Sequence, residues 1–171
     1  VIVTNDEDKA DYMRFLSTQA KDKKPFYHHT DIGYNYRMSN VLAAIGVAQM
    51  EVIEERIKRT REVNEIYRKE VGHLFYTFQE ERKTDRSNMW LTCALMKGED
   101  KPEDLIAHLE KDNIEARRIW KPMHEQPIMS KYLKYINGNS SLLFLQGITL
   151  PSGSDLTKQD LKRIIKSIKT F

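Results

Sequence analysis

The sequence has little of what marks an exported, membrane-spanning or disordered protein. Cys93 is the only cysteine, so no disulfide can form within the chain. No apolar run approaches the roughly 18 residues of a membrane span, and no basic segment followed by an apolar one stands at the amino end. Glycine and proline number only 7 and 5 in 171 residues, which disfavours disorder and fibrous repeats. We therefore expect a folded, cytoplasmic protein without a membrane partner.

The chain also lacks a strong excess of either charge. It has 28 lysines and arginines against 25 acidic residues, interleaved along the sequence, for a formal charge of +3. That balance is too mild to indicate a nucleic-acid partner. The most basic stretch, residues 158–169, is interrupted by Asp160 and has no aromatic platform for bases.

Hydrophobic periodicity predicts helices alternating with short strands. We expect a strand at residues 1–3, a helix over 8–20, a loop over 26–38, and a long helix over 39–71 with a break near 49–54. The long helix carries acidic and basic residues four apart, which favours ion pairs on its exposed side. The expected later elements are strands at 88–96, 114–120 and 147–150, and helices from Pro102, over 140–145, and after the capping box 157–160. This order predicts an α/β or α+β sandwich.

The first and second predicted strands carry two further expectations. A strand at residues 1–3 needs a partner that the nearby sequence does not offer, so we expect a piece of a larger sheet, with an ordinary edge strand as the alternative. The apolar run 89–95, which contains Cys93, is expected to be buried.

Residues 27–40 form the most informative loop. In an extended segment, Asn35 and Arg37 project to one side while Tyr34 and Tyr36 project to the other. An amide beside a guanidinium, just before a helix begins, suits a phosphate. The alternative is that Arg37 ties the loop to a carboxylate and the two tyrosines belong to the core.

The same loop contains His28, His29 and Asp31, three residue types that bind metals. Adjacent histidines diverge on most backbones, and no further ligand stands at a helical or hairpin spacing. We therefore expect no metal site.

A second candidate loop spans residues 117–127. It combines Trp120, Lys121 and His124 between two prolines that stiffen the backbone. Such a loop could bind an anionic ligand with an apolar body. The alternative is that Trp120 fills the core and His124 caps a turn.

These loops carry a resemblance to a known family. The run Gly-Tyr-Asn-Tyr-Arg-Met-Ser at 33–39, followed by a helix of small residues at 41–49, closely resembles the signature of the DegT/DnrJ/StrS sugar aminotransferases. Residues 1–6, Trp-Lys-Pro-Met-His at 120–124 with Gln-Pro at 126–127, and Ile-Thr-Leu-Pro-Ser-Gly at 148–153 agree in order and spacing. The resemblance covers nearly the whole chain.

The resemblance implies the C-terminal part of a pyridoxal-phosphate-dependent transferase of fold type I. Residues 1–50 would end the large cofactor domain with a strand, a helix, the phosphate-contact loop and a further helix. Residues 51–171 would form the small α/β domain with a short sheet, and the long helices would lie at a homodimer interface.

The resemblance also implies a function. Family members transfer an amino group, with glutamate as the expected donor, to a nucleotide-linked keto-sugar. Here the expected acceptor is a UDP-4-keto-6-deoxy-N-acetylhexosamine that serves as a surface-glycan precursor. By resemblance, Asn35 contacts the cofactor phosphate of the other subunit and Arg37 supports that loop or binds the substrate's phosphates. Trp120, Lys121 and His124 are similar to residues that line the nucleotide-sugar pocket.

Two departures from the family pattern matter. The lysine that forms the Schiff base with the cofactor precedes the segment that resembles residues 1–3, so we expect no catalytic residue here and an inactive chain on its own. Glu125 stands where an apolar residue is more usual, which could shift substrate preference. The alternative function is a non-catalytic dimerisation module derived from the family.

Overall fold

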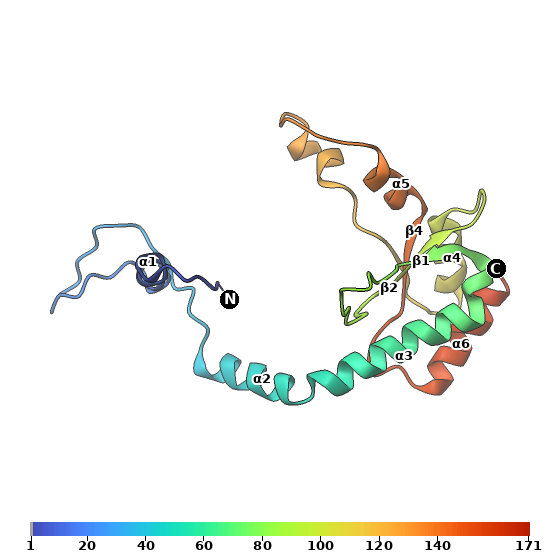
Figure 1. Ribbon diagram of the computed structural model, residues 1–171, viewed down its shortest axis with the longest axis horizontal. Helices are drawn as coiled ribbons and strands as arrows, with labels where there is room; N and C mark the ends of the chain where they lie inside the picture. Colours follow the sequence, from blue (N-terminus) through green and yellow to red (C-terminus); the bar gives the residue numbers. More distant parts are fainter. Residues whose placement is uncertain (1) are drawn as a thin grey trace. The chain divides into compact units, whose positions relative to one another are not determined.

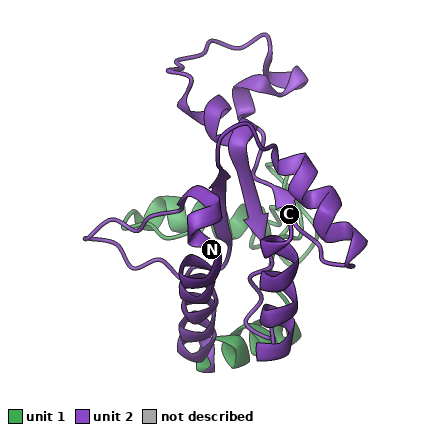
Figure 2. Ribbon diagram, turned by 90° about the vertical axis from the view of Figure 1, so that its right-hand side faces the viewer, with its two compact units in different colours: residues 1–51 green, residues 52–171 purple. Residues whose placement is uncertain are grey.

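The computed structural model describes residues 2–171 and divides the chain into two compact units, Val1–Glu51 and Val52–Phe171 (Figures 1 and 2). The division falls one residue after the predicted boundary. The assignment of the first unit to a cofactor domain stays a prediction.

Unit 1 contains helices α1 (Glu7–Ser17) and α2 (Asn40–Glu51). Helix α1 begins at the Asp6 cap, whose carboxylate accepts a hydrogen bond from the Lys9 backbone at 3.0 Å. It ends three residues before the predicted residue 20, because Gln19 and Ala20 adopt φ values of 66° and 48° that a right-handed helix cannot contain.

The predicted strand at residues 1–3 is wrong where the structure describes it. Ile2 and Val3 form no strand and are 74% and 87% exposed, while Val1 lies outside the described residues. Their β-branched side chains favour extended backbone, but a strand forms only with a hydrogen-bonded neighbour.

Helix α2 begins as predicted, with Ser39 Oγ accepting a hydrogen bond from the Leu42 backbone at 3.3 Å. It ends at Glu51, and helix α3 (Ile53–Val71) begins two residues later, which confirms the predicted break. Within unit 1 the large apolar side chains of α2 are exposed: Val41, Leu42, Ile45, Val47 and Met50.

Unit 2 is built on a four-stranded antiparallel sheet in the order β1-β2-β4-β3. The strands are β1 (Phe75–Phe78), β2 (Thr92–Met96), β3 (Arg117–Arg118) and β4 (Gly147–Leu150). β4 agrees with its prediction, β2 and β3 are shorter than predicted, and β1 was missed. The bounds of β3 follow from its partner, since only Thr149 and Ile148 of β4 pair with it.

Three helices cover one face of this sheet (Figure 1): α3, α4 (Pro102–Lys111) and α6 (Lys158–Lys169). The Thr157–Asp160 capping box that starts α6 confirms its prediction. The core contains only residues of unit 2: Val63, Tyr67, Val71, Phe75, Phe78, Ala94, Met96, Leu105, Leu109, Ile114, Ala116, Ile148, Leu150, Leu161, Ile164, Ile165 and Ile168. The fold is the expected α/β arrangement of helices with one short sheet.

The other face of the sheet is only partly covered. Along β2, the residues Thr92, Ala94 and Met96 are buried, whereas Cys93 and Leu95 on the opposite face are half-buried. The short helix α5 (Asn139–Gln146) lies near this face, after two single 3₁₀ turns at Met123–Glu125 and Pro127–Met129. No helix within residues 2–171 has both the length and the apolar content for a membrane crossing.

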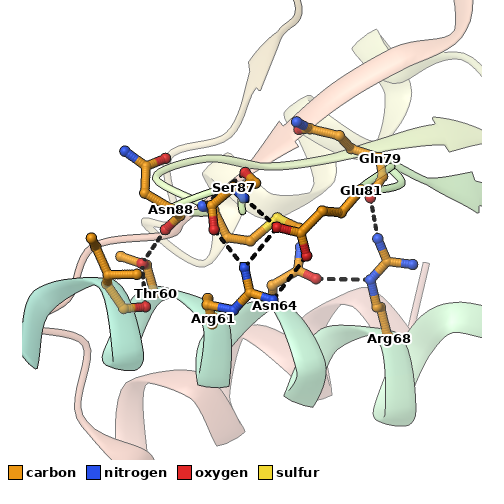
Figure 3. Close-up of polar contacts among 10 residues, drawn as sticks. Thr60, Arg61, Asn64, Arg68, Gln79, Glu81, Ser87 and Asn88 are labelled. Carbon is orange, nitrogen blue, oxygen red and sulfur yellow. Dashed lines mark hydrogen bonds and ion pairs between the residues drawn. The ribbon is translucent and has the colours of Figure 1, made fainter. Parts of the chain in front are cut away.

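The segment before β2 is fastened to α3 by polar contacts (Figure 3). The Arg61 guanidinium donates to both carboxylate oxygens of Glu81, at 3.0 and 2.9 Å, and to the Ser87 carbonyl at 2.5 Å. This hydrogen-bonded ion pair lowers the pKa of Glu81 to about 2. The ion pairs recorded for residues 2–171 include none between residues four apart on α3, contrary to the expectation. Arg59 pairs with Glu62 three residues further along the helix, and the other recorded pairs of α3 join it to other segments.

Candidate functional site

The segment 33–39 is held by backbone hydrogen bonds to the end of α1. Tyr34 N–H donates to the Leu16 carbonyl at 3.1 Å, and Tyr36 N–H donates to the Ser17 carbonyl at 3.0 Å. Thr18 and Asn35 form an antiparallel bridge at the centre of this contact. The segment is therefore extended, as the sequence predicted, and its residues alternate between two sides.

Gly33 is required for this close approach. A Cβ at Gly33 would lie 2.5 Å from the Ala20 backbone nitrogen and 2.6 Å from the Leu16 carbonyl oxygen. Both are backbone atoms that cannot rotate away. Only glycine lets the two segments come this near.

The tyrosines and the candidate anion ligands lie as the alternation requires. The Tyr34 and Tyr36 rings are neighbours, with centroids 5.6 Å apart, but they are 60% and 77% exposed. The alternative in which these tyrosines form a core is therefore wrong for unit 1. Asn35 and Arg37 are also exposed, and neither side chain has a hydrogen-bond or ion-pair partner in the described part of the chain. The alternative that Arg37 ties the loop to a carboxylate finds no support there.

The two histidines of this loop contact the segment that follows α1. His28 Nδ1 lies 2.5 Å from Asp22 Oδ2, and this contact lowers the pKa of the Asp22 carboxyl. His29 Nδ1 lies 3.0 Å from the Gln19 carbonyl and 3.1 Å from that of Ala20, the two residues of positive φ. Within residues 2–171, no group of three or more histidine, cysteine or acidic side chains is arranged to hold a metal ion.

The second candidate loop lies in unit 2 and follows β3. Trp120 is 68% exposed, so the alternative in which it fills the core is wrong. Lys121 is exposed, whereas His124 is half-buried, with Nε2 3.3 Å from Ser141 Oγ and 3.7 Å from Glu125 Oε1. His124 thus connects the loop to α5. Trp120, Lys121 and His124 all belong to unit 2, while Asn35 and Arg37 belong to unit 1.

Trp120 is part of the wall of a hollow on the partly covered face of the sheet. The hollow measures about 810 Å³ and is bounded by β1, β2 and α5, with Cys93 and Leu95 at its floor. Volumes of roughly 300–1,000 Å³ are usual for small-molecule sites. Burial raises the pKa of the Cys93 thiol, so this cysteine behaves as an apolar lining group.

Sequence reasoning missed one residue near this hollow. Trp90 was expected inside a buried run but is 62% exposed, and its ring centroid lies 6.1 Å from that of Trp120. Met89, Thr92 and Ala94 are the buried members of that run, and Met89, which precedes Trp90, has a positive φ of 47°. The reversal of direction at Met89 turns Trp90 outward, and hydrophobic pattern alone does not reveal such a reversal.

A sequence model of the DegT/DnrJ/EryC1/StrS aminotransferase family matches residues 1–169. The chain belongs to this family. This match confirms the resemblance seen in residues 33–39, 120–127 and 148–153.

Curated proteins similar to this chain are longer than the chain. The EpsN protein of Bacillus subtilis (strain 168) is 39% identical over 171 residues, which are 97% of this chain and 44% of EpsN. The GDP-perosamine synthase of Escherichia coli O157:H7 is 34% identical over 172 residues, or 100% of this chain and 46% of the synthase. The chain thus spans about half the length of the curated relatives it matches.

A solved structure shows the same fold. Helicobacter pylori PseC, an aminotransferase involved in the biosynthesis of pseudoaminic acid, superposes with a TM-score of 0.85 at 20% identity. The superposition covers 98% of this chain and 47% of PseC.

Proposed function

We propose that this chain is the C-terminal part of a pyridoxal-phosphate-dependent enzyme that transfers an amino group from glutamate to a nucleotide-linked keto-sugar. The observation that carries the proposal is the segment 33–39. It is extended, anchored by its backbone to α1, and presents Asn35 and Arg37 with their donors free of partners in the described residues.

The donors fit the phosphate of pyridoxal 5'-phosphate. The Asn35 amide offers two N–H groups and the Arg37 guanidinium five, and both suit phosphate oxygens. Helix α2 begins at Asn40, close in sequence, and the positive end of its dipole favours an anion. Bound pyridoxal phosphate supplies the electron sink that allows an amino group to move between donor and acceptor.

In this proposal each residue has a defined task. Asn35 holds the cofactor phosphate of the other subunit in a homodimer, and Arg37 supports the loop or binds the substrate's phosphates. Trp120 and Lys121 present an apolar face and a cation to the sugar nucleotide. His124, held at Ser141 and Glu125, lines the same pocket.

We further propose UDP-4-keto-6-deoxy-N-acetylhexosamine as the acceptor, in the cytoplasmic synthesis of a surface-glycan precursor. This rests on the resemblance of residues 120–124 to enzymes for such sugars. The name of the Escherichia coli relative includes GDP. An assay must therefore first establish whether the nucleotide of the acceptor is UDP or GDP. The lysine that binds the cofactor is expected outside residues 1–171, and the chain alone should not transfer amino groups.

The decisive experiment uses a protein of full family length that contains this chain. It is incubated with pyridoxal phosphate, glutamate and a panel of UDP- and GDP-linked 4-keto-sugars. Mass spectrometry then measures the amino-sugar product together with 2-oxoglutarate. Formation of both with a UDP-linked N-acetyl sugar supports the full proposal, transfer only to GDP-linked sugars overturns the substrate, and no transfer to any sugar overturns the function.

Asn35→Ala tests the cofactor contact. Loss of one charge-assisted hydrogen bond should weaken cofactor binding by about 1–3 kcal/mol, or roughly 5- to 150-fold in Kd. Asn5→Ala is the matched control, since Asn5 is another exposed asparagine of unit 1. Equal cofactor affinity in both variants, measured by absorbance titration, would remove Asn35 from the site.

A non-catalytic dimerisation module is the second candidate. It is favoured by the exposed apolar side chains along α2, which suit contact with protein. A dimeric full-length protein that retains no cofactor would support this candidate against the enzyme.

A further inference from the structure

The two tryptophans of this chain lie side by side although 30 residues separate them. Their ring centroids are 6.1 Å apart, the planes are tilted by 36°, and both side chains are more than half exposed. A single exposed aromatic residue needs no explanation, but two large rings that converge outside the core form a surface suited to a ligand.

Trp90 is held in this place by a backbone under constraint. Met89 adopts a positive φ, which costs a non-glycine residue free energy, and its side chain is only 7% exposed. Conformations of this kind persist where the surroundings enforce them, and they cluster at functional sites.

The enforcing contacts come from α3 (Figure 3). Arg61 donates to the Ser87 carbonyl, and Thr60 Oγ1 donates to the Asn88 carbonyl, each at 2.5 Å. The Glu81 carboxylate accepts hydrogen bonds from the Arg61 guanidinium and from the Ser87 backbone N–H. Three consecutive residues before Trp90 are therefore fixed, and the indole is presented in one position.

The segment that carries Trp120 is anchored to α5. Its neighbour Arg118 donates to the Phe144 carbonyl of α5 and stacks on the Phe144 ring at 4.0 Å. Pro122 stiffens the chain two residues later. Both indoles thus have fixed supports, and an aromatic site that is built in advance loses little entropy when a ligand binds.

The tilt and spacing of the two indole rings limit how a ligand can bind to them. The rings are too close for a third ring to enter between them, since two stacking distances need about 7 Å. They instead form an angled corner in which a planar ring can stack on one indole and meet the edge of the other. Lys121, the next residue in the chain after Trp120, has an exposed cationic side chain, and Gln79 and Glu80 add polar groups at the hollow that Trp120 lines.

We propose that Trp90 and Trp120 bind the base of a nucleoside diphosphate, with Lys121 close to its phosphates. The inference rests on the proposed function, which it deepens by naming Trp90 as a further ligand-binding residue and the base as the group bound there. Arg61 and Glu81 are positioning residues, because they act through the backbone before Trp90.

The chain offers a direct test, because Trp90 and Trp120 are its only tryptophans and intrinsic fluorescence reports on this pair alone. UDP and GDP are titrated in parallel with inorganic pyrophosphate, which has the charge but no base. The expected result is saturable quenching by at least one nucleotide and none by pyrophosphate. Equal effects of pyrophosphate, or no effect of either nucleotide, overturn the proposal.

Variants assign the effect to Trp90. Trp90→Leu should weaken nucleotide binding roughly 5- to 150-fold, the range expected for loss of one stacked base, whereas Trp90→Phe should retain most of it. Phe171→Leu is the matched control, an exposed aromatic residue that packs on His108 instead. Unchanged nucleotide affinity in Trp90→Leu overturns the proposal. So does an emission shift that grows with protein concentration, because a second copy would then cover the rings.

A protein of full family length separates this inference from the proposed function. In Trp90→Leu, the KM for the sugar nucleotide should rise relative to the KM for glutamate, which has no base. Amino transfer with an unchanged ratio of the two KM values leaves the function and removes the inference. Base-dependent binding that needs Trp90, without any amino transfer, leaves the inference and removes the function.

Discussion

The two units differ in where their apolar side chains lie. Unit 2 buries a continuous core between one face of its sheet and three helices. Among residues 2–51, Ala20 alone is buried, and α2 exposes its large apolar side chains. Unit 2 is therefore held together by side-chain packing. In unit 1, the segment around Gly33 is held to the end of α1 by backbone hydrogen bonds.

The largest expected effect comes from the same substitution made in both units. Leu109 is fully buried on α4 and Leu42 is 58% exposed on α2. Leu109→Ala should lower the free energy of unfolding by about 2–5 kcal/mol, because it removes apolar contacts and leaves a cavity. Leu42→Ala should change it by less than about 0.5 kcal/mol. Urea unfolding of the 171-residue chain measures both, and similar values would contradict the difference between the units.

Two glycines of unit 1 test its dependence on backbone contact. Gly33→Ala should cost about 1–3 kcal/mol in the local opening of segment 33–39, because the added methyl group meets backbone atoms. Gly46→Ala, inside α2 with nothing within 4 Å of a Cβ, should instead stabilise the helix by about 0.5–1 kcal/mol.

Hydrogen exchange of the Tyr34 and Tyr36 amides measures the local opening in Gly33→Ala. Circular dichroism measures the stabilisation of α2 in Gly46→Ala. The urea midpoint of unit 2 should change in neither variant. A loss of unit 2 stability in Gly33→Ala would mean that the two units do not fold independently.

The smallest effect concerns the pH dependence of unit 2. The pKa of Glu81 falls from its ordinary 4.5 to about 2 in the folded state, because Arg61 donates to its carboxylate. A lowered folded-state pKa stabilises the fold above pH 4.5, and this contribution is lost as the pH falls toward 2.

Glu81→Gln should therefore flatten the decline of the urea midpoint between these pH values. Glu115→Gln is the matched control, because Glu115 pairs with Arg117 where both side chains are largely exposed. An identical decline in wild type and Glu81→Gln would exclude this ion pair as a source of acid sensitivity.

Features governed by local chemistry could be predicted from the sequence. The capping box at Thr157 and the break between α2 and α3 follow from residue type and spacing alone. The extended form of segment 33–39 and the shared side of Tyr34 and Tyr36 were also predicted correctly. The family signature in the same segment led to the family that the comparison established.

Features that depend on distant partners could not be predicted. β1 has only four residues, and its pairing with β2 decides that it is a strand. The exposure of Trp90 depends on the φ of Met89 and on Arg61, which is 26 residues from Ser87. The acidic residues of α3 likewise bind basic residues far along the chain, such as Arg86, because the fold brings those segments together.

The two outer strands of the sheet are also poor templates for a strand from another molecule. β3 has only two residues, both arginine, and β1 has an irregular register between Phe75 and Thr77. Short, charged or irregular edges discourage the edge-to-edge pairing that leads to aggregation. Any specific self-association of this protein should therefore use side-chain surfaces such as α2 and leave the hydrogen-bonding edges of the sheet unpaired.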